Sequence, residues 1–139
     1  MNGKVYIAGG RLESGFRSAA TAVFEAFDPV TNTWSEAAPM LLPRSGMNGV
    51  VAYGCFHVWG GEGQFGMFPD HDVYDPESNT WTGLDNMPLP VHGVTGAAFY
   101  DGLIHLPGGG IQTGGSSGSR LNQVYTPRRC AASSAAALP

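Results

Sequence analysis

Charged residues are scarce in this chain of 139 residues, because Asp, Glu, Lys and Arg together make up only 13% of it. The formal net charge of −4 argues against a dedicated nucleic-acid surface, since such surfaces are usually basic. No apolar run approaches the roughly 18 residues that a membrane-spanning helix requires. No charged-then-apolar signal peptide opens the chain. We expect the N-terminus to be truncated, because the chain begins inside a repeated unit, and the localisation stays undetermined.

Cysteine is also sparse. The two cysteines, Cys55 and Cys130, lie far apart in different sequence contexts, so we expect no disulfide framework and draw no conclusion about the redox compartment. The chain is instead rich in Gly (21 residues) and Pro (10 residues), and 11% of it is aromatic. This composition is typical of many short strands joined by tight turns, and it predicts an all-β fold without helices.

One sequence unit occurs nearly three times. Its first half is a short apolar strand that ends on two glycines, as in GKVYIAGG, GCFHVWGG and GLIHLPGG. Its second half is a strand ending on an aromatic residue, followed by a turn (Asp-Pro in the first two copies) and, in these copies, by a strand with Trp; the two Trp are 47 residues apart. A period near 50 residues is that of kelch propeller blades. The motif residues are Gly9, Gly10, Asp28, Trp34, Gly60, Gly61, Asp75, Trp81, Gly108 and Gly109.

On these residues, and on the two Met-x-x-Pro segments that open new blades, the chain resembles the kelch-repeat proteins of the galactose-oxidase-like propeller group. The resemblance covers about residues 3–127 and implies a partial kelch-type β-propeller of antiparallel four-stranded blades. We expect about ten strands, as three, four and three. The predicted domain is 1–127, with blades at roughly 3–37, 46–84 and 93–126, and 128–139 is predicted to be a low-complexity, disordered tail.

A propeller typically needs about 4 to 8 blades to close. We therefore expect the chain to be a fragment of a longer protein, or else copies of it to assemble into a ring. Either missing blades of the parent chain or self-association would then cover the open blade faces. The alternating residues of the three second strands form one apolar set that we expect to pack between blades, namely Val5, Ile7, Phe56, Val58, Ile104 and Leu106.

Each remaining motif has a local physical reason. The double glycines end strands where the backbone takes a positive φ or approaches a neighbouring sheet. Asp28 and Asp75 open hairpin turns in which the carboxylate accepts a local backbone hydrogen bond. Trp34 and Trp81 should bury their rings against the adjacent blade and keep their indole N–H groups bonded.

Candidate ligand-binding residues lie on the connections between strands. Arg44 and Ser45 lie on one crossing between blades, and His92 lies on the next, at a mouth of the channel. The planar guanidinium of Arg44 suits a carboxylate or sugar hydroxyls, although Arg44 and His92 could instead only tie loops together. Phe65 and Phe68 lie on a loop, where they could contact a sugar ring or a partner protein, or fold down as a cap.

The other histidines do not indicate a metal site. Tyr6, His57 and His105 occupy one equivalent position on three blades, and such positions do not converge, so we expect His57 to be a packing residue. His71 begins a strand, and we expect it to make a strand-end hydrogen bond. We expect no metal site and no cofactor. The glycine-rich loop 108–119 lacks the ending of a phosphate-binding loop and no helix follows it, so we expect a plain connection.

These features favour a binding module for a protein or glycan partner, with no nucleic acid and no membrane span involved. The alternative is part of a propeller enzyme of the sugar-oxidase or sialic-acid-epimerase type; a third possibility is a truncated product without function. The resemblance implies that a sugar oxidase would need a copper site of two His and two Tyr, one Tyr crosslinked to Cys. Cys55 has no such set near it in the sequence, and no catalytic residue is predicted.

Overall fold

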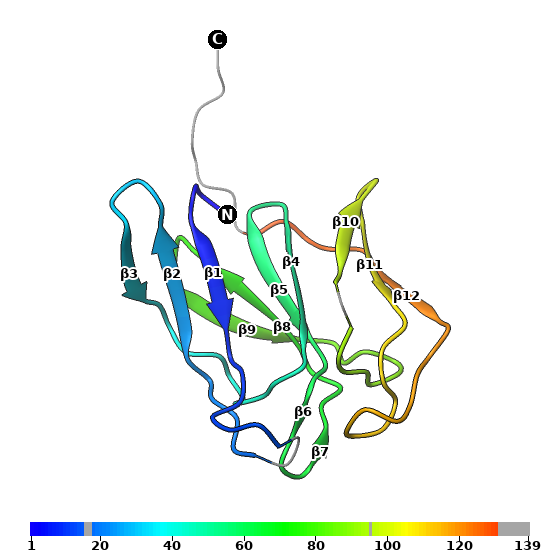
Figure 1. The fold of residues 1–139 in the computed structure, drawn as a ribbon. Helices are drawn as coiled ribbons and strands as arrows, with labels where there is room; N and C mark the ends of the chain where they lie inside the picture. Colours follow the sequence, from blue (N-terminus) through cyan, green and yellow to red (C-terminus); the bar gives the residue numbers. More distant parts are fainter. Residues whose placement is uncertain (16–17, 95, 131–139) are drawn as a thin grey trace.

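The computed structural model describes residues 1–15, 18–94 and 96–130. The chain forms three antiparallel sheets side by side and one small hairpin, and no helix is found within these ranges (Figure 1). The first sheet has the order β1-β2-β3, the second β4-β5-β8-β9 and the third β10-β11-β12. The strands are β1 (Val5–Ala8), β2 (Phe24–Asp28), β3 (Thr33–Glu36), β4 (Asn48–Ala52), β5 (Cys55–Trp59), β6 (Glu62–Gly63), β7 (Gly66–Met67), β8 (His71–Asp75), β9 (Thr80–Leu84), β10 (Ala98–Tyr100), β11 (Leu103–Pro107) and β12 (Asn122–Tyr125).

The predicted all-β propeller fold with three, four and three strands is confirmed. The first sheet lacks the strand that corresponds to β4, and the third lacks the one that corresponds to β9, among the residues that the structure describes. The sequence did not predict the hairpin β6–β7, which lies in the loop between β5 and β8. We refer to the three sheets below as the first, second and third blades.

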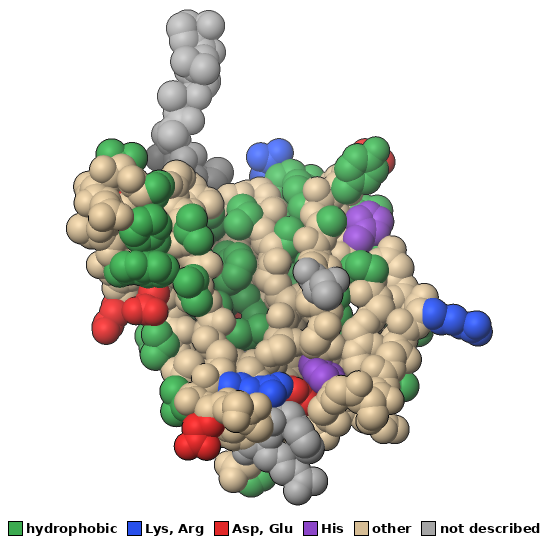
Figure 2. All heavy atoms as spheres, viewed as in Figure 1, with side chains coloured by type: hydrophobic (Ala, Val, Ile, Leu, Met, Phe, Trp, Pro, Cys, Tyr) green, Lys and Arg blue, Asp and Glu red, His purple; other side chains and the backbone are tan. Residues whose placement is uncertain are grey.

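The core lies between the blades. Ile104 and Leu106 of the third blade pack with Trp59 of the second and with Val91 of the crossing between them, and all four are almost fully buried. Val5 and Ile7 hold the same repeat positions on the first blade but are 56% and 49% exposed. The face of the sheet that carries them has no neighbouring blade within the described residues, and Figure 2 shows hydrophobic side chains gathered on this part of the surface.

The two tryptophans show the same contrast. Trp81 lies between the first two blades, where its ring centroid is 5.0 Å from that of Phe24. Its indole Nε1 donates a hydrogen bond of 2.8 Å to the Ala38 carbonyl, as predicted. Trp34 contacts Phe27 within its own blade, at 5.1 Å between centroids, and stays 53% exposed. Trp81 is therefore half-buried against the first blade, whereas Trp34 has no neighbouring blade within the described residues, and the prediction of a buried ring is wrong for Trp34.

The Asp-Pro turns form as predicted. Oδ1 of Asp28 accepts a hydrogen bond from the Val30 amide, and Oδ1 of Asp75 accepts one from the Glu77 amide, both at 2.9 Å. Asn79 takes the left-handed conformation, with a φ of 53°. These turns fix the register of the two outer strand pairs.

The prediction of no disulfide is wrong, because Cys55 and Cys130 form one. Cys55 begins β5, and the bond holds Arg128–Cys130 against the second blade, although these residues belong to the predicted tail. The guanidinium of Arg129 also lies over the Tyr53 ring, at 4.8 Å from its centroid. Residues 131–139 of that tail lie outside the described residues. The two cysteines are 75 residues apart, and no local pattern links them.

Gly60 and Gly108 hold the same repeat position, and both have a positive φ, of 61° and 71°. A Cβ atom at Gly60 would lie 2.2 Å from the Val91 carbonyl oxygen, whereas one at Gly108 would meet Ser119 only at 3.3 Å. Both substitutions to Ala carry the cost of the left-handed conformation, but only Gly60→Ala also forces backbone apart. We expect Gly60→Ala to lower the free energy of unfolding by about 1–3 kcal/mol more than Gly108→Ala, measured by urea denaturation. Equal losses would contradict the close approach.

Candidate functional site

Arg44 is buried within the second blade. Its side chain is inaccessible to solvent, forms an ion pair with the Asp72 carboxylate on β8 and donates a hydrogen bond of 3.1 Å to the Asp70 carbonyl. Burial lowers the pKa of Arg44 and raises that of Asp72, while the charge of each partner opposes the shift of the other. The guanidinium thus connects the segment between the first two blades to β8, which agrees with the alternative that Arg44 only ties loops together. Its ligand-binding role stays a prediction.

Ser45 and Glu62 join the first crossing to the hairpin β6–β7. The Ser45 amide donates to the Glu62 carbonyl at 3.0 Å, and the Glu62 amide donates back to the Ser45 carbonyl at 2.8 Å. Arg11, from the loop after β1, donates from Nε to the Ser45 hydroxyl at 2.9 Å and pairs with the Glu62 carboxylate. Only 1% of Glu62 is exposed, so Arg11 supplies the charge that a buried carboxylate needs.

His92 reaches the same carboxylate from the second crossing. Its Nδ1 lies 3.5 Å from Oε1 of Glu62, and its Nε2 is 2.7 Å from the Gln112 carbonyl oxygen. The Gly114 amide donates a hydrogen bond of 2.8 Å to Oε2 of Glu62. Figure 2 shows basic, acidic and histidine side chains together at this end of the molecule. We call this group the Glu62 cluster, and its members are Arg11, Ser45, Glu62, His92 and Gly114.

The Glu62 cluster brings two predicted residues, Ser45 and His92, into one place. Arg11 and Glu62, which connect them, were not predicted from the sequence. The signal was available, because Arg11, Glu62 and Gly110 each stand two residues after the first glycine of a Gly-Gly pair. In two of the three copies this position pairs with the crossing that leads into its own blade, as Glu62 with Ser45 and Gly110 with His92.

The two phenylalanines of the hairpin loop differ in exposure. Phe65, between β6 and β7, is 97% exposed. Phe68 is half-buried over the hairpin, and its ring leaves no room for a side chain at Gly63. The Phe68 amide also donates to the Gly61 carbonyl at 3.0 Å, which anchors the base of the hairpin. Phe68 therefore folds down, while Phe65 is exposed in the turn of the hairpin β6–β7, which lies at one end of the molecule (Figure 1).

The histidines His57 and His71 form a buried pair inside the second blade. Nδ1 of His57 lies 3.0 Å from Nε2 of His71, and each residue is 1% exposed. The ring of Trp59 stacks on His71 at 4.1 Å between centroids, and Tyr125 meets His71 edge-on at 4.6 Å. Burial lowers the pKa of His57 to about 4. Burial, then the charges of His57 and Arg44, lower the pKa of His71 to about 3.

The pair is a packing arrangement of neutral rings. Along the repeat, His57 corresponds to Tyr6 and His71 to Phe24, and the rings of Tyr6 and Phe24 stack at 5.4 Å in the first blade. Within residues 1–15, 18–94 and 96–130, no three His, Cys, Asp or Glu side chains are placed where they could hold a metal ion. In the same ranges, no helix is long and apolar enough to cross a membrane.

Comparisons with known proteins agree with this geometry. The model of the kelch motif family matches residues 1–41. An F-box/kelch-repeat protein of Arabidopsis thaliana is 41% identical over 58 residues, which are 42% of this chain and 15% of that protein. Kelch-like protein 23 of Pongo abelii is 34% identical over 61 residues, which are 44% of this chain and 9% of that protein. The chain thus spans only a small part of the length of these relatives.

The solved structure of YjhT gives the fold independently. It superposes with a TM-score of 0.66 at 22% identity, over 81% of this chain and 33% of YjhT. The chain is a partial kelch-repeat β-propeller. Kelch-repeat domains generally mediate protein interactions.

Proposed function

We propose that the chain is a protein-binding module and that its partner docks on the end of the propeller that carries Phe65 and the Glu62 cluster. The observation that carries this proposal is the 97% exposure of Phe65. Aromatic side chains anchor protein interfaces when they enter a pocket of the partner, because they bury a large apolar area at little cost in side-chain entropy.

The Glu62 cluster supports this role by making the base of the hairpin rigid. The cluster draws Arg11 from the first blade and His92 and Gly114 from the segments around the third onto one carboxylate. Phe65 is therefore presented from a preorganised base, which reduces the entropy lost on binding. A projecting side chain suits a pocket on a protein, whereas small ligands such as sugars bind in concave sites. This favours a protein over a glycan partner.

Phe65→Ala tests the proposal. The side chain is almost fully exposed, so we expect the folding stability to stay within about 0.5 kcal/mol of the original value. The matched control is Val30→Ala, since Val30 is 91% exposed in the β2–β3 turn, at the opposite end of the molecule (Figure 1). In quantitative affinity purification, we expect proteins retained by the unchanged chain and by Val30→Ala to be lost with Phe65→Ala.

Two results would overturn the proposal. One is retention of the same proteins by Phe65→Ala and by the unchanged chain. The other is saturable binding on a glycan array that Phe65→Ala abolishes, with no protein retained in the purification. A glycan result of that kind would assign the same surface to carbohydrate.

A further inference from the structure

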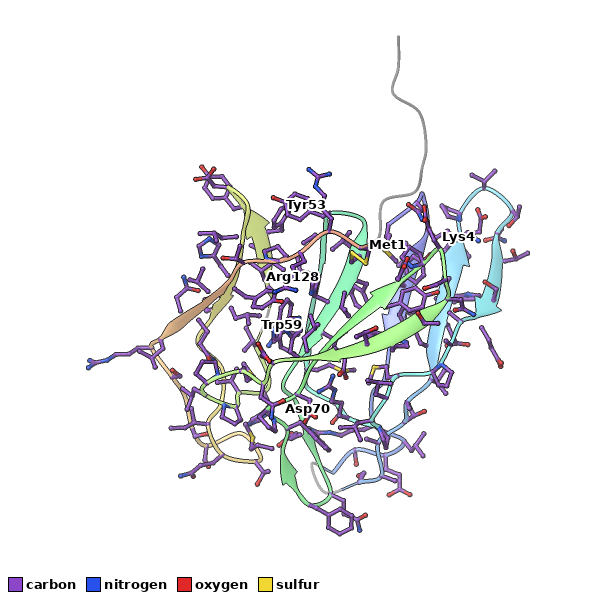
Figure 3. The ribbon with its side chains drawn as sticks, turned by 180° about the vertical axis from the view of Figure 1, so that it is seen from behind. Met1, Lys4, Tyr53, Trp59, Asp70 and Arg128 are labelled. Carbon is purple, nitrogen blue, oxygen red and sulfur yellow. A yellow bond between two sulfur atoms is a disulfide. The ribbon has the colours of Figure 1, made fainter. Side chains whose placement is uncertain are left out.

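A groove of about 710 Å³ opens on the outer half of the boundary between the second and third blades. Strands β8 and β9 form one wall, with Val73, Thr82 and Leu84 among its residues. Tyr125 at the end of β12 and the segment Arg128–Cys130 form the other wall. In Figure 3, which shows the molecule from behind, this segment crosses from the third blade toward β5 and carries the labelled Arg128.

The corresponding space between the first and second blades is filled by Trp81. Its ring lies 5.3 Å from Tyr74, and its indole N–H is bonded to the Ala38 carbonyl. Trp81 belongs to β9, the outer strand of the second blade, which pairs with β8. The ring reaches back from this strand onto the preceding blade.

The residues that correspond in the repeat to Tyr74 and Ala38 line the groove. Tyr125 stands 51 residues after Tyr74, and Asp85 stands 47 residues after Ala38, and both line the groove. The rings of Tyr6 and Tyr74 are 6.2 Å apart, and those of His57 and Tyr125, which correspond to them, are 6.1 Å apart. Two contacts of Trp81, with Tyr74 and with the Ala38 carbonyl, therefore have counterparts in the groove, at Tyr125 and Asp85.

The third blade also has a free strand edge beside the groove. Its last strand, β12, pairs with β11 on one side, and no described residue pairs with its other side. In the second blade that side of the equivalent strand, β8, is occupied by β9. Unpaired backbone groups along such an edge are the template for strand addition.

The segment that follows β12 does not turn back to form the missing strand within the described residues. In the second blade the chain reverses after Asp75 and returns as β9. After Tyr125 the chain instead runs to the disulfide with Cys55, where the Cys130 amide also donates a 2.8 Å hydrogen bond to Sγ of Cys55. The sequence places Ala132, not Trp, 51 residues after Trp81.

We propose that this groove binds an extended segment of a partner protein, which pairs with β12 as a fourth strand and inserts a tryptophan against Tyr125. The indole N–H of that tryptophan bonds to the Asp85 carbonyl, as Trp81 bonds to the Ala38 carbonyl. The occupied site between the first two blades supports this choice, because Trp81 there packs on Tyr74 and bonds to the Ala38 carbonyl, whose counterparts in the groove are Tyr125 and Asp85. This site is separate from Phe65 and does not depend on the proposal above.

The probe for the test is a fluorescent synthetic peptide with the sequence of residues 77–85, ESNTWTGLD, titrated with the full chain. We expect saturable 1:1 binding in fluorescence anisotropy. A peptide with Ala in place of its Trp should bind at least about ten-fold more weakly. Hydrogen exchange should slow at the amides of Asn122–Tyr125 when the peptide binds.

Substitutions in the chain test whether the peptide binds in the groove. Thr82 is exposed and lines the groove, so Thr82→Arg should fill it without loss of folding and weaken binding at least about ten-fold. Thr31→Arg, at the exposed β2–β3 turn, should leave binding unchanged.

Equal binding by the Ala peptide, equal binding by Thr82→Arg, or protection elsewhere than β12 would overturn the proposal. So would absence of binding at millimolar peptide. Sedimentation velocity of the chain alone tests whether a second copy of the chain occupies the groove. A dimer that dissociates when the peptide is added would assign the groove to a second copy and overturn the assignment to a partner protein.

Discussion

Replacing Arg44 by Met should lower the free energy of unfolding by about 3–5 kcal/mol, since it leaves a buried carboxylate without its partner. Asp72 is 3% exposed, and the Arg44 guanidinium is its only ion-pair partner in the described residues. Met fills much of the space of the arginine stem, so the loss reports the missing charge and hydrogen bonds more than a cavity. Urea denaturation followed by tryptophan fluorescence measures it.

A double-mutant cycle separates the ion pair from other effects. Adding Asp72→Asn to Arg44→Met removes the uncompensated charge, so the double variant should be more stable than Arg44→Met alone. Arg120→Met is the matched control, because Arg120 is exposed and has no ion-pair partner in the described residues, and it should change stability by less than about 0.5 kcal/mol. If Arg44→Met also lowers the free energy of unfolding by less than about 0.5 kcal/mol, the ion pair between Arg44 and Asp72 does not stabilise the segment that connects the first two blades.

The repeat is the reason that so much of the fold could be predicted. Gly60, Asp75 and Trp81 each have a local requirement that the sequence states directly: a positive φ, a turn carboxylate and a large ring facing the preceding blade. Since each requirement recurs with the same spacing, the number of strands in each blade follows from it. Half-buried Trp81 and exposed Trp34 differ because repeat equivalence predicts the direction of a side chain and not what it meets there.

The candidate site was predicted less well because it depends on positions whose residue type differs between the copies of the repeat. Glu62 gathers its partners only because Arg11 and Glu62, at equivalent positions, have opposite charges and meet across adjacent blades. The link between Cys55 and Cys130 joins positions without repeat equivalents of the same type. Arg44 was predicted to be available to a ligand because its crossing lies near the mouth, but its side chain turns inward to Asp72.

One pair of equivalent positions has different residue types in the three blades, although its two side chains contact each other in each blade. Tyr6 and Phe24 stack in the first blade, and His57 and His71 form a hydrogen-bonded pair at the same place in the second. In the third blade, His105 and Asn122 lie there, with 3.1 Å between Nδ1 and Nδ2. The second pair is the only one of the three that is both ionisable at each position and almost fully buried, so we expect it to make the fold sensitive to acid.

Lowering the pH from 7 to 5 should lower the free energy of unfolding by about 4 kcal/mol through this pair. The folded pKa values of about 4 for His57 and about 3 for His71 lie below the ordinary value of 6.5, so the fold favours the neutral rings. The stabilisation is complete above about pH 6.5 and is lost as the pH falls toward the folded values, because the unfolded chain takes up protons first. Asp72, whose pKa is raised, acts in the opposite sense, and Arg44 stays charged in this range.

The first blade supplies the matched control. The double variant His57→Tyr, His71→Phe recreates the pair of Tyr6 and Phe24 and removes both titrating groups while keeping a stacked aromatic contact. Urea denaturation at pH 7, 6 and 5 should show a loss of up to about 1.4 kcal/mol per pH unit for each histidine in the original chain, and little of it in the variant. His92 and His105 are present in both proteins, so their contribution cancels in the comparison. The same dependence on pH in the variant would assign the acid sensitivity to groups other than the buried pair.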